Sequence, residues 1–280
     1  MRYSFGVRSR VRNFVHGFEV QSSMSGVANQ PQPMIEAQGL SKFYGNFAAC
    51  RGVSFQIRRG EVVAFLGPNG AGKSTTMKLL TGYLSPSEGR ARIAGHDMAS
   101  DRMEGARRLG YLPENGPLYP EMTPFASLTF FAEARGMTPQ RKRSRMEYVI
   151  DLCGLGSVLH KPIGKLSKGF RQRVGMAQAL LHEPDVLIMD EPTAGLDPNQ
   201  IREVRETLLR LGQEKTILLS THIMQEVDAM ASRAIVINEG RLVYDGPISE
   251  LTQGNKKLDE RFRELTSGGQ SPSVQQASAS

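Results

Sequence analysis

Four short runs of large apolar residues are spaced along the chain, and each is continuous rather than alternating with polar residues. They cover residues 62–66, 186–189, 216–219 and 234–237. A continuous apolar run is typical of a strand that is buried on both faces of a parallel sheet. Segments compatible with helices begin near Pro198 and His222. The alternation of the two patterns predicts an α/β domain built on a mostly parallel sheet.

Shorter strand candidates precede and follow the first of these runs. They cover residues 35–40, 53–57, 91–94 and 109–112. The first two are expected to form an antiparallel layer, and Arg59-Gly60 turns the chain towards the strand at 62–66. From Pro124 to about Cys153 the apolar residues recur at helical spacing instead. This stretch predicts a helical subdomain within residues 115–180.

The turn after residues 62–66 carries the most specific chemical signal. It reads Gly67-Pro68-Asn69-Gly70-Ala71-Gly72-Lys73-Ser74-Thr75 and fits the pattern G-x-x-x-x-G-K-[ST]. A strand that ends in a glycine-rich turn and opens a helix directs several backbone N–H groups and the positive helix end into one concavity. We expect all nine residues to bind a nucleoside triphosphate, with Lys73 at the β- and γ-phosphates and the Ser74 hydroxyl on Mg²⁺. The alternative is an accidental glycine-rich turn, which the strand–loop–helix context disfavours.

Two carboxylates follow the apolar run at 186–189, namely Asp190 and Glu191. The carboxyl ends of parallel strands form the crevice where open α/β sheets bind ligands. Asp190 is therefore a candidate ligand of Mg²⁺, and Glu191 a candidate base that polarises a water for attack on the γ-phosphate. Taken alone, the pair could also be a solvated acidic turn at the end of a strand.

Between these two motifs lies Leu166-Ser167-Lys168-Gly169-Phe170-Arg171-Gln172-Arg173. Taken with them, this segment resembles the signature of the ATP-binding subunits of ABC transporters. Three further segments match, in the expected order, the aromatic residue that stacks on adenine, the D-loop and the switch histidine: Tyr44, Gly195-Leu196-Asp197-Pro198 and Ser220-Thr221-His222. The resemblance extends from about Met34 to Gly246.

The resemblance implies a phosphate-loop ATPase domain over residues 34–247, with a mostly parallel core sheet, an antiparallel β layer and a helical subdomain. It implies ATP and Mg²⁺ as cofactors and catalytic roles for Lys73, Glu191 and His222. It further implies a homodimer or heterodimer in which Ser167 and Gly169 of one subunit close over the ATP held by the other, with Asp197 also at the nucleotide. Alone, Leu-Ser-Lys-Gly would be an ordinary helix start.

The chain departs from the family pattern at two places. The signature has Lys168 and Phe170 where glycine and glutamine are usual, although Ser167 and Gly169 are intact. The second departure is Glu114, which stands where the family usually has a glutamine that touches Mg²⁺ and the attacking water. A carboxylate has a similar reach and can still bind the metal, so Glu114 remains a predicted metal ligand whose added negative charge leaves its catalytic importance open.

Three segments narrow the resemblance to the ATPases of ABC-2-type exporters, including gliding-motility-associated and multidrug-type subunits. They are Tyr111-Leu112-Pro113-Glu114-Asn115, the signature, and Ser220-Thr221-His222-Ile223-Met224-Gln225-Glu226-Val227. This reading implies a separate transmembrane permease and a peripheral position on the cytoplasmic face of the inner membrane. The alternative is a non-transport ABC ATPase of the translation or DNA-maintenance type that works with a soluble partner. Neither the cargo nor the direction of transport follows from these motifs.

Composition agrees with one α/β domain of ordinary size. The chain has 280 residues and a net charge of +7, with its basic residues spread out and not interleaved with aromatics, so no nucleic acid is expected as a partner. The only cysteines, Cys50 and Cys153, form no C-x-x-C pair, which favours a reduced compartment. No run approaches the 18 apolar residues of a membrane span.

The two ends of the chain differ from its centre. Residues 1–33 are basic and then Gln/Ser/Pro-rich, and two explanations stay open: a disordered basic arm, or a start site assigned too far upstream. Residues 248–266 are expected to form a helical extension and residues 267–280 a disordered tail. The remaining histidines have no motif around them and are expected to be surface or turn residues: His16, His96, His160 and His182.

Overall fold

The structure is a computed structural model that describes residues 32–221, 223–252 and 257–267. The expectations for residues 1–31 and 268–280 fall outside the described residues, and so does the predicted switch histidine, His222. Ser267, which was expected to begin the tail, is instead the last residue of a helix.

The core is a six-stranded sheet in the order β10-β9-β3-β8-β7-β6. Its strands are β3 (Val62–Leu66), β6 (Leu109–Leu112), β7 (Val186–Asp190), β8 (Thr216–Ser220), β9 (Arg233–Asn238) and β10 (Arg241–Pro247). All neighbouring pairs are parallel except β9 and β10, which are antiparallel. The mostly parallel core sheet expected from the apolar runs is therefore confirmed. The edge strand β10 was not predicted, because its residues are partly exposed and give no continuous apolar run.

A second, antiparallel sheet has the order β2-β1-β4-β5. It consists of β1 (Ile35–Tyr44), β2 (Phe47–Ile57), β4 (Glu88–Ile93) and β5 (His96–Asp97). The antiparallel layer is thus confirmed, but β1 and β2 are longer than predicted. They continue to a two-residue turn at Gly45 and Asn46, where Gly45 takes a positive φ of 58°. The sequence did not predict these strand ends, because they are exposed and carry polar residues in place of an apolar pattern.

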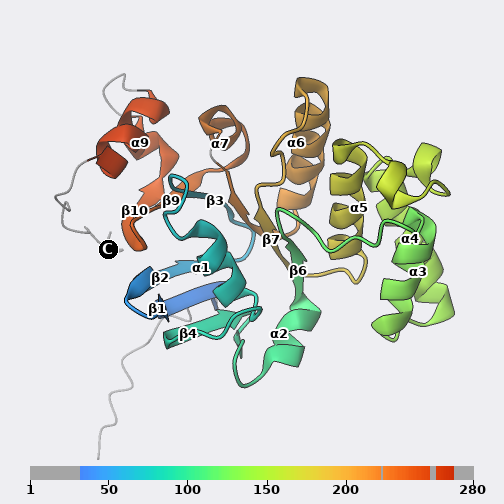
Figure 1. Cartoon of the computed structure of the whole chain (residues 1–280), viewed down its shortest axis with the longest axis horizontal. Helices are drawn as coiled ribbons and strands as arrows, with labels where there is room; N and C mark the ends of the chain where they lie inside the picture. The colour runs from blue at the N-terminus through green and yellow to red at the C-terminus, as the bar shows by residue number, and fades with distance from the viewer. Residues whose placement is uncertain (1–31, 222, 253–256, 268–280) are drawn as a thin grey trace, which may run out of the picture. The chain divides into compact units, whose positions relative to one another are not determined.

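Helices connect the strands and cover the sheets. They are α1 (Lys73–Leu80), α2 (Arg102–Arg108), α3 (Pro124–Ala134), α4 (Pro139–Leu152), α5 (Lys168–Leu180), α6 (Pro198–Gly212), α7 (Met224–Met230), α8 (Ile248–Leu251) and α9 (Leu258–Ser267). The helical subdomain expected within residues 115–180 contains α3, α4 and α5, which lie together to one side of the core sheet (Figure 1). Helices α3, α4 and α6 begin alike, with a Thr or Asp N-cap followed by proline at the first helical position.

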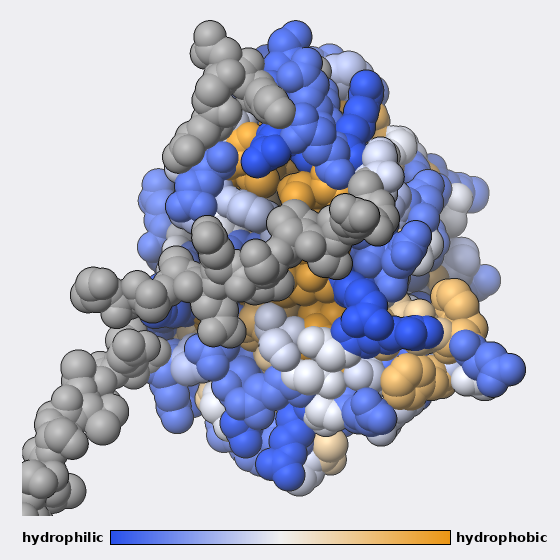
Figure 2. Space-filling model, turned by 90° about the vertical axis from the view of Figure 1, so that its left-hand side faces the viewer, coloured by the Kyte–Doolittle hydropathy of each residue, from blue (hydrophilic) through white to orange (hydrophobic). Residues whose placement is uncertain are grey.

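The buried apolar residues form three clusters. One lies between the antiparallel sheet, α1 and one face of the core sheet, and a second lies between its other face and the helices α3–α6. The third cluster contains residues of β3, β9, α7, α8 and α9. Leu258 of α9 is buried in it, and Phe262 packs against the cluster. Figure 2 shows the side that carries α9 and β10, which is mostly hydrophilic with apolar residues visible between polar ones. Within the described residues, no helix is long and apolar enough to cross a membrane.

Candidate nucleotide site

The predicted phosphate loop connects β3, which ends at Leu66, to α1, which begins at Lys73. Two of its glycines lie where a side chain would meet neighbouring backbone. A Cβ at Gly67 would lie 2.5 Å from the Ile237 carbonyl oxygen, and Gly72 is the N-cap of α1 with a φ of 104°. The loop therefore folds closely against β9 and presents the N-terminus of α1 towards its own concavity, as the sequence predicts.

Lys73 is held inside this loop. Its Nζ donates hydrogen bonds to the carbonyl oxygens of Gly67 at 2.7 Å and Pro68 at 3.3 Å. It also lies 4.0 Å from Glu191 Oε1, and both side chains are about nine-tenths buried. Carbonyl oxygens that accept from a buried amine fix the orientation of its side chain. The structure thus brings Lys73 and Glu191 to one place, from segments that are more than a hundred residues apart.

Asp190 and Glu191 lie at the end of β7, as predicted. Asp190 is almost fully buried and accepts a 2.6 Å hydrogen bond from the Ser220 hydroxyl at the end of β8. Glu191 has a left-handed backbone with a φ of 50°, and its N–H donates to the Ser220 carbonyl oxygen at 3.2 Å and hydroxyl at 3.0 Å. A non-glycine residue in this conformation is strained by about 1–3 kcal/mol. The two neighbouring carboxylates therefore have different partners: Asp190 contacts Ser220, and Glu191 lies near Lys73.

A cleft of about 430 Å³ surrounds the phosphate loop. Its walls come from the loop, the β1–β2 hairpin, the end of β6 and the end of β7: Phe47, Ala49, Pro68, Asn69, Gly70, Gly72, Lys73, Ser74, Thr75, Glu114, Glu191 and Ala194. No signature residue is among them. The part of the chain that the structure describes also contains no cluster of three or more His, Cys, Asp or Glu residues able to hold a metal alone. A cation here would need hydroxyl, phosphate or water ligands beside Asp190, which suits Mg²⁺.

Glu114 is exposed and lines two cavities at once. Besides the nucleotide cleft, it lines a smaller cavity of about 240 Å³ between the segment 115–120 and the first turns of α5. Lys168 and Arg171 line this second cavity as well. Glu114 and Lys168, two of the three residues that depart from the family pattern, thus line the same cavity and carry opposite charges. Sequence alone could not reveal this proximity, because the residues are 54 positions apart.

The signature residues contact the D-loop and the start of α6, and they do not line the cleft around the phosphate loop. Ser167 is the N-cap of α5 and accepts a hydrogen bond from the Phe170 N–H. Gly169 is covered by the side chain of Gln200 from α6, and Lys168 reaches over Gly195. Asp197 caps α6 by accepting from two backbone N–H groups at 3.0 Å, and the helix begins at Pro198, near the predicted start.

The β1–β2 hairpin carries two exposed aromatic residues that face each other across its turn, Tyr44 and Phe47. Phe47 lines the nucleotide cleft, whereas Tyr44 is not among the lining residues. The Lys42 ammonium lies 5.6 Å from the centre of the Tyr44 ring, so one ring face is occupied. Phe47 was missed from the sequence, where it carries no motif. The signal that could have found it is its position opposite Tyr44 in a two-residue hairpin.

Tyr111 belongs to one of the segments that narrow the resemblance, but no motif gives it a role of its own. It lies on β6 with a buried hydroxyl that has no hydrogen-bond partner among the described residues. Burial raises the pKa of its phenol well above the usual value, and the negative charge of Asp190 adds to this effect. The phenol is therefore neutral and stays a potential donor close to the predicted metal ligand.

The fold and this cleft define a phosphate-loop nucleotide-binding protein with a strand-end carboxylate pair, and known sequences agree. The sequence profile described as "ABC transporter" matches residues 50–194. The bacitracin transport ATP-binding protein BcrA of Bacillus licheniformis is 35% identical over 229 residues, which cover 81% of this chain and 74% of that protein. The Nod factor export ATP-binding protein I of Ralstonia nicotianae is 36% identical, with 78% and 68% covered.

Among solved structures, the chain is similar to one described as "Structure of ATP binding subunit of ABC transporter". The two share 32% sequence identity and a TM-score of 0.76, over 83% of this chain and 99% of the other. The chain therefore belongs to the ABC transporter family. It is an ATP-binding subunit of that family, and its enzymatic activity is ATP hydrolysis.

Proposed function

We propose that the chain is the ATP-hydrolysing subunit of an ABC-2-type exporter and that it works as a dimer. The observation that carries the dimer is the composition of the nucleotide cleft. Its walls hold the phosphate loop and Glu191 but no residue of the signature. Ser167 and Gly169 lie instead at the start of α5, against α6. A second copy, or a related subunit, would supply the missing wall and close over the γ-phosphate.

Within each closed site, we assign the chemistry to residues that the cleft brings together. Lys73 and the loop N–H groups would hold the phosphates, and Ser74, Asp190 and Glu114 would hold Mg²⁺ with help from water. The metal would polarise the γ-phosphate, and Glu191 would accept a proton from the attacking water. His222 of the switch segment would contact the γ-phosphate, and Asp197 would approach the nucleotide across the dimer.

The adenine position gives a direct test. Replacing Tyr44 by Ala is expected to weaken ATP and GTP binding alike, by about 1–3 kcal/mol, because stacking on an aromatic ring tolerates any base. Phe43 is the matched control, since it is the preceding residue on β1 and points to the other face of the strand. Titration with fluorescent nucleotide analogues measures the affinities. Unchanged affinity for Tyr44→Ala would leave Tyr44 as a turn residue, with Phe47 as the next candidate.

An exposed aromatic surface follows Glu114 and suits a permease contact. Tyr119 and Phe130 are both about half exposed, and their rings form an edge-to-face pair with centroids 6.5 Å apart. Phe131, next along α3, turns towards the core instead. Such an exposed aromatic pair beside a Pro/Gly-rich loop fits a protein–protein contact better than solvent. Glu114 directly precedes this loop and lines the nucleotide cleft, so we assign it the transmission of the contact.

This attachment predicts where the protein resides. We expect it at the cytoplasmic face of the inner membrane, bound to the permease and not through residues 1–33. Deleting residues 2–33 should leave the membrane-bound fraction unchanged, whereas deleting the permease gene should release the protein. Cell fractionation with an antibody to the chain measures both. The reverse pattern would make the N-terminal residues the anchor.

The alternative, a non-transport ABC ATPase with a soluble partner, accounts less well for these features. The chain has one phosphate loop and one signature, about 90 residues apart, without sustained heptads between them. The names of two relatives, which describe bacitracin transport and Nod factor export, favour the exporter. Retention of the protein by a membrane protein encoded beside it would decide between the two.

A further inference from the structure

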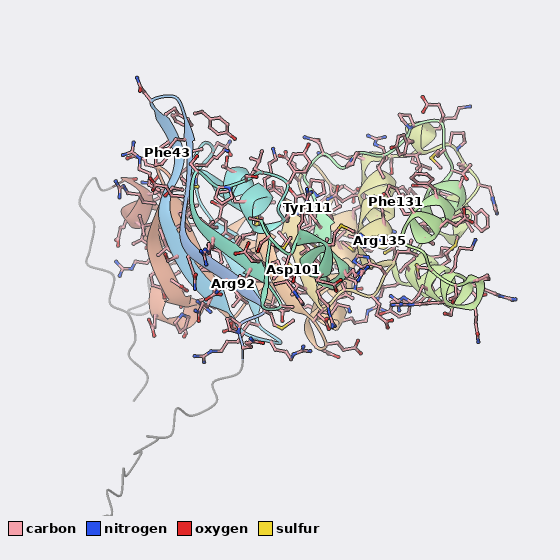
Figure 3. The ribbon with its side chains drawn as sticks, turned by 90° about the horizontal axis from the view of Figure 1, so that it is seen from below. Phe43, Arg92, Asp101, Tyr111, Phe131 and Arg135 are labelled. Atoms are coloured by element: carbon pink, nitrogen blue, oxygen red, sulfur yellow. The ribbon has the colours of Figure 1, made fainter. Side chains whose placement is uncertain are left out.

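A buried hydroxyl group on β6 takes no part in the chemistry assigned to the cleft. It belongs to Tyr111, and no described residue lies within hydrogen-bond distance of it. A phenol carries a donor, and a buried donor without a partner costs free energy. Native folds keep few such groups, so the place of this one in the structure is informative. Figure 3 shows Tyr111 between α1 and the group of helices α3, α4 and α5.

The register of the core sheet places Tyr111 close to the predicted metal ligand on β7. Tyr111 pairs with Ile188, and Asp190 lies two residues further along the same strand. Because side chains alternate along a strand, Ile188 and Asp190 point to the same face of the sheet. Tyr111 packs against the apolar cluster that contains Ile188, so it shares this face. Diagonal neighbours on adjacent strands are within reach of an aromatic side chain.

One oxygen of the Asp190 carboxylate already has a partner, and the other does not. Oδ1 accepts the 2.6 Å hydrogen bond from the Ser220 hydroxyl, whereas no described residue donates to Oδ2. Ser220 is paired with Asp190 on β8, and Tyr111 comes from β6, the neighbouring strand on the other side of β7. A carboxylate that is 2% exposed is stabilised by every donor it can reach. Tyr111 is therefore placed to serve the oxygen that Ser220 does not bind.

Tyr83, in the loop after α1, is the other polar side chain near this phenol. Burial raises the pKa of Tyr111 first of all, and the charge of Asp190 acts on it more strongly than that of Tyr83. Tyr83 is 68% exposed, so its hydroxyl can bond to water instead. A charged acceptor also makes a stronger hydrogen bond than a neutral one. Asp190 is thus the better partner for Tyr111.

We propose that Tyr111 is a positioning residue for ATP hydrolysis: its O–H group donates to Oδ2 of Asp190 when nucleotide and metal are bound, so that hydroxyl groups from both neighbouring strands orient this carboxylate. The torsion that turns an aspartate carboxyl group is soft, so Asp190 can turn towards Tyr111 at small cost. Outer partners of this kind fix the direction in which a carboxylate presents its lone pairs to a metal. The inference rests on the proposed function, in which Asp190 helps to hold Mg²⁺.

The test removes the hydroxyl group and nothing else. Tyr111→Phe should weaken Mn²⁺ binding to the full chain loaded with a non-hydrolysable ATP analogue by at least about tenfold, as loss of an outer partner of a metal ligand does. Electron paramagnetic resonance of free Mn²⁺ measures this affinity. Binding of the analogue in EDTA should not change, because Tyr111 does not line the nucleotide cleft. In an Asp190→Asn background the replacement should have no further effect on Mn²⁺, since the hydroxyl acts through that carboxylate.

Stability without nucleotide separates a positioning role from a structural bond. Tyr111→Phe should leave the urea midpoint unchanged or raise it, because the hydroxyl has no partner to lose among the described residues. Tyr244→Phe is the matched control. The Tyr244 hydroxyl donates to the Pro247 carbonyl oxygen at 2.7 Å, on β10 and outside the nucleotide cleft. This control should lower the urea midpoint and leave Mn²⁺ binding as in the wild type.

The outcomes distinguish this inference from the proposed function. Wild-type Mn²⁺ binding by Tyr111→Phe, together with impaired binding by Asp190→Asn, would overturn the role of Tyr111 and leave the proposed metal site standing. Wild-type Mn²⁺ binding by Asp190→Asn would refute Asp190 as a metal ligand, and with it that part of the proposed function. If the urea midpoint of Tyr111→Phe fell as far as that of Tyr244→Phe, the hydroxyl would have a structural partner such as a buried water, and the inference would be overturned.

Discussion

Replacing Glu191 by Gln is expected to slow ATP turnover by at least about 10²-fold while ATP binding is retained. The factor is the scale of a lost general base. Gln has the size of Glu and keeps an acceptor oxygen near Lys73, which lies 4.0 Å from the carboxylate. It cannot accept the proton of an attacking water. Because hydrolysis is what separates the proposed dimer, the variant should also accumulate as an ATP-bound dimer.

The matched control for this substitution is Glu183→Gln. Glu183 and Glu191 flank the two ends of β7, and both have a left-handed backbone, with φ values of 67° and 50°. Glu183 lies outside the nucleotide cleft. Steady-state hydrolysis with the permease present, together with size-exclusion chromatography in ATP, measures both variants. A general-base role for Glu191 would be refuted by near-normal turnover of Glu191→Gln.

The apolar runs predicted the core of the fold because buried parallel strands leave a direct mark on sequence. Residues 109–112 form β6 with the predicted bounds, and α6 begins at Pro198, where the sequence predicted a helix start. Strands that face solvent have a weaker apolar pattern in the sequence. The hairpin ends at Tyr44 and Phe47 and the edge strand β10 are fixed by pairing with neighbours, which a single sequence does not display.

The positions of the candidate site residues were predictable where one short segment determines the geometry. This holds for the phosphate loop, which a local turn places, and for the carboxylate pair, which the end of a strand places. Contacts between distant segments were not predictable. The hydrogen bond from Ser220 to Asp190 depends on the pairing of β7 with β8. The cavity shared by Glu114 and Lys168 depends on how α5 packs beside the segment after β6.

Replacing Gly72 by Ala is expected to lower the free energy of unfolding by about 3 kcal/mol or more. The φ of 104° is in a region that L-residues rarely adopt, which alone costs about 1–3 kcal/mol. In addition, the new Cβ would overlap the carbonyl oxygen of Ala49, which is backbone and cannot turn aside. The N-terminus of α1 must therefore shift, and ATP affinity should fall at least about tenfold, equal to about 1.4 kcal/mol.

Gly70→Ala separates backbone strain from steric overlap. Gly70 belongs to the same loop and has a φ of 80°, but a Cβ there would meet nothing within 4 Å. Its cost should stay near the 1–2 kcal/mol of a left-handed L-residue. Since the chain has no tryptophan, urea unfolding is followed by circular dichroism, without nucleotide so that ligand binding does not add to stability. If both variants lost the same free energy of unfolding, the loop backbone would have shifted at Gly72 to accommodate the new Cβ. The close approach of Gly72 to β2 would then not fix the start of α1.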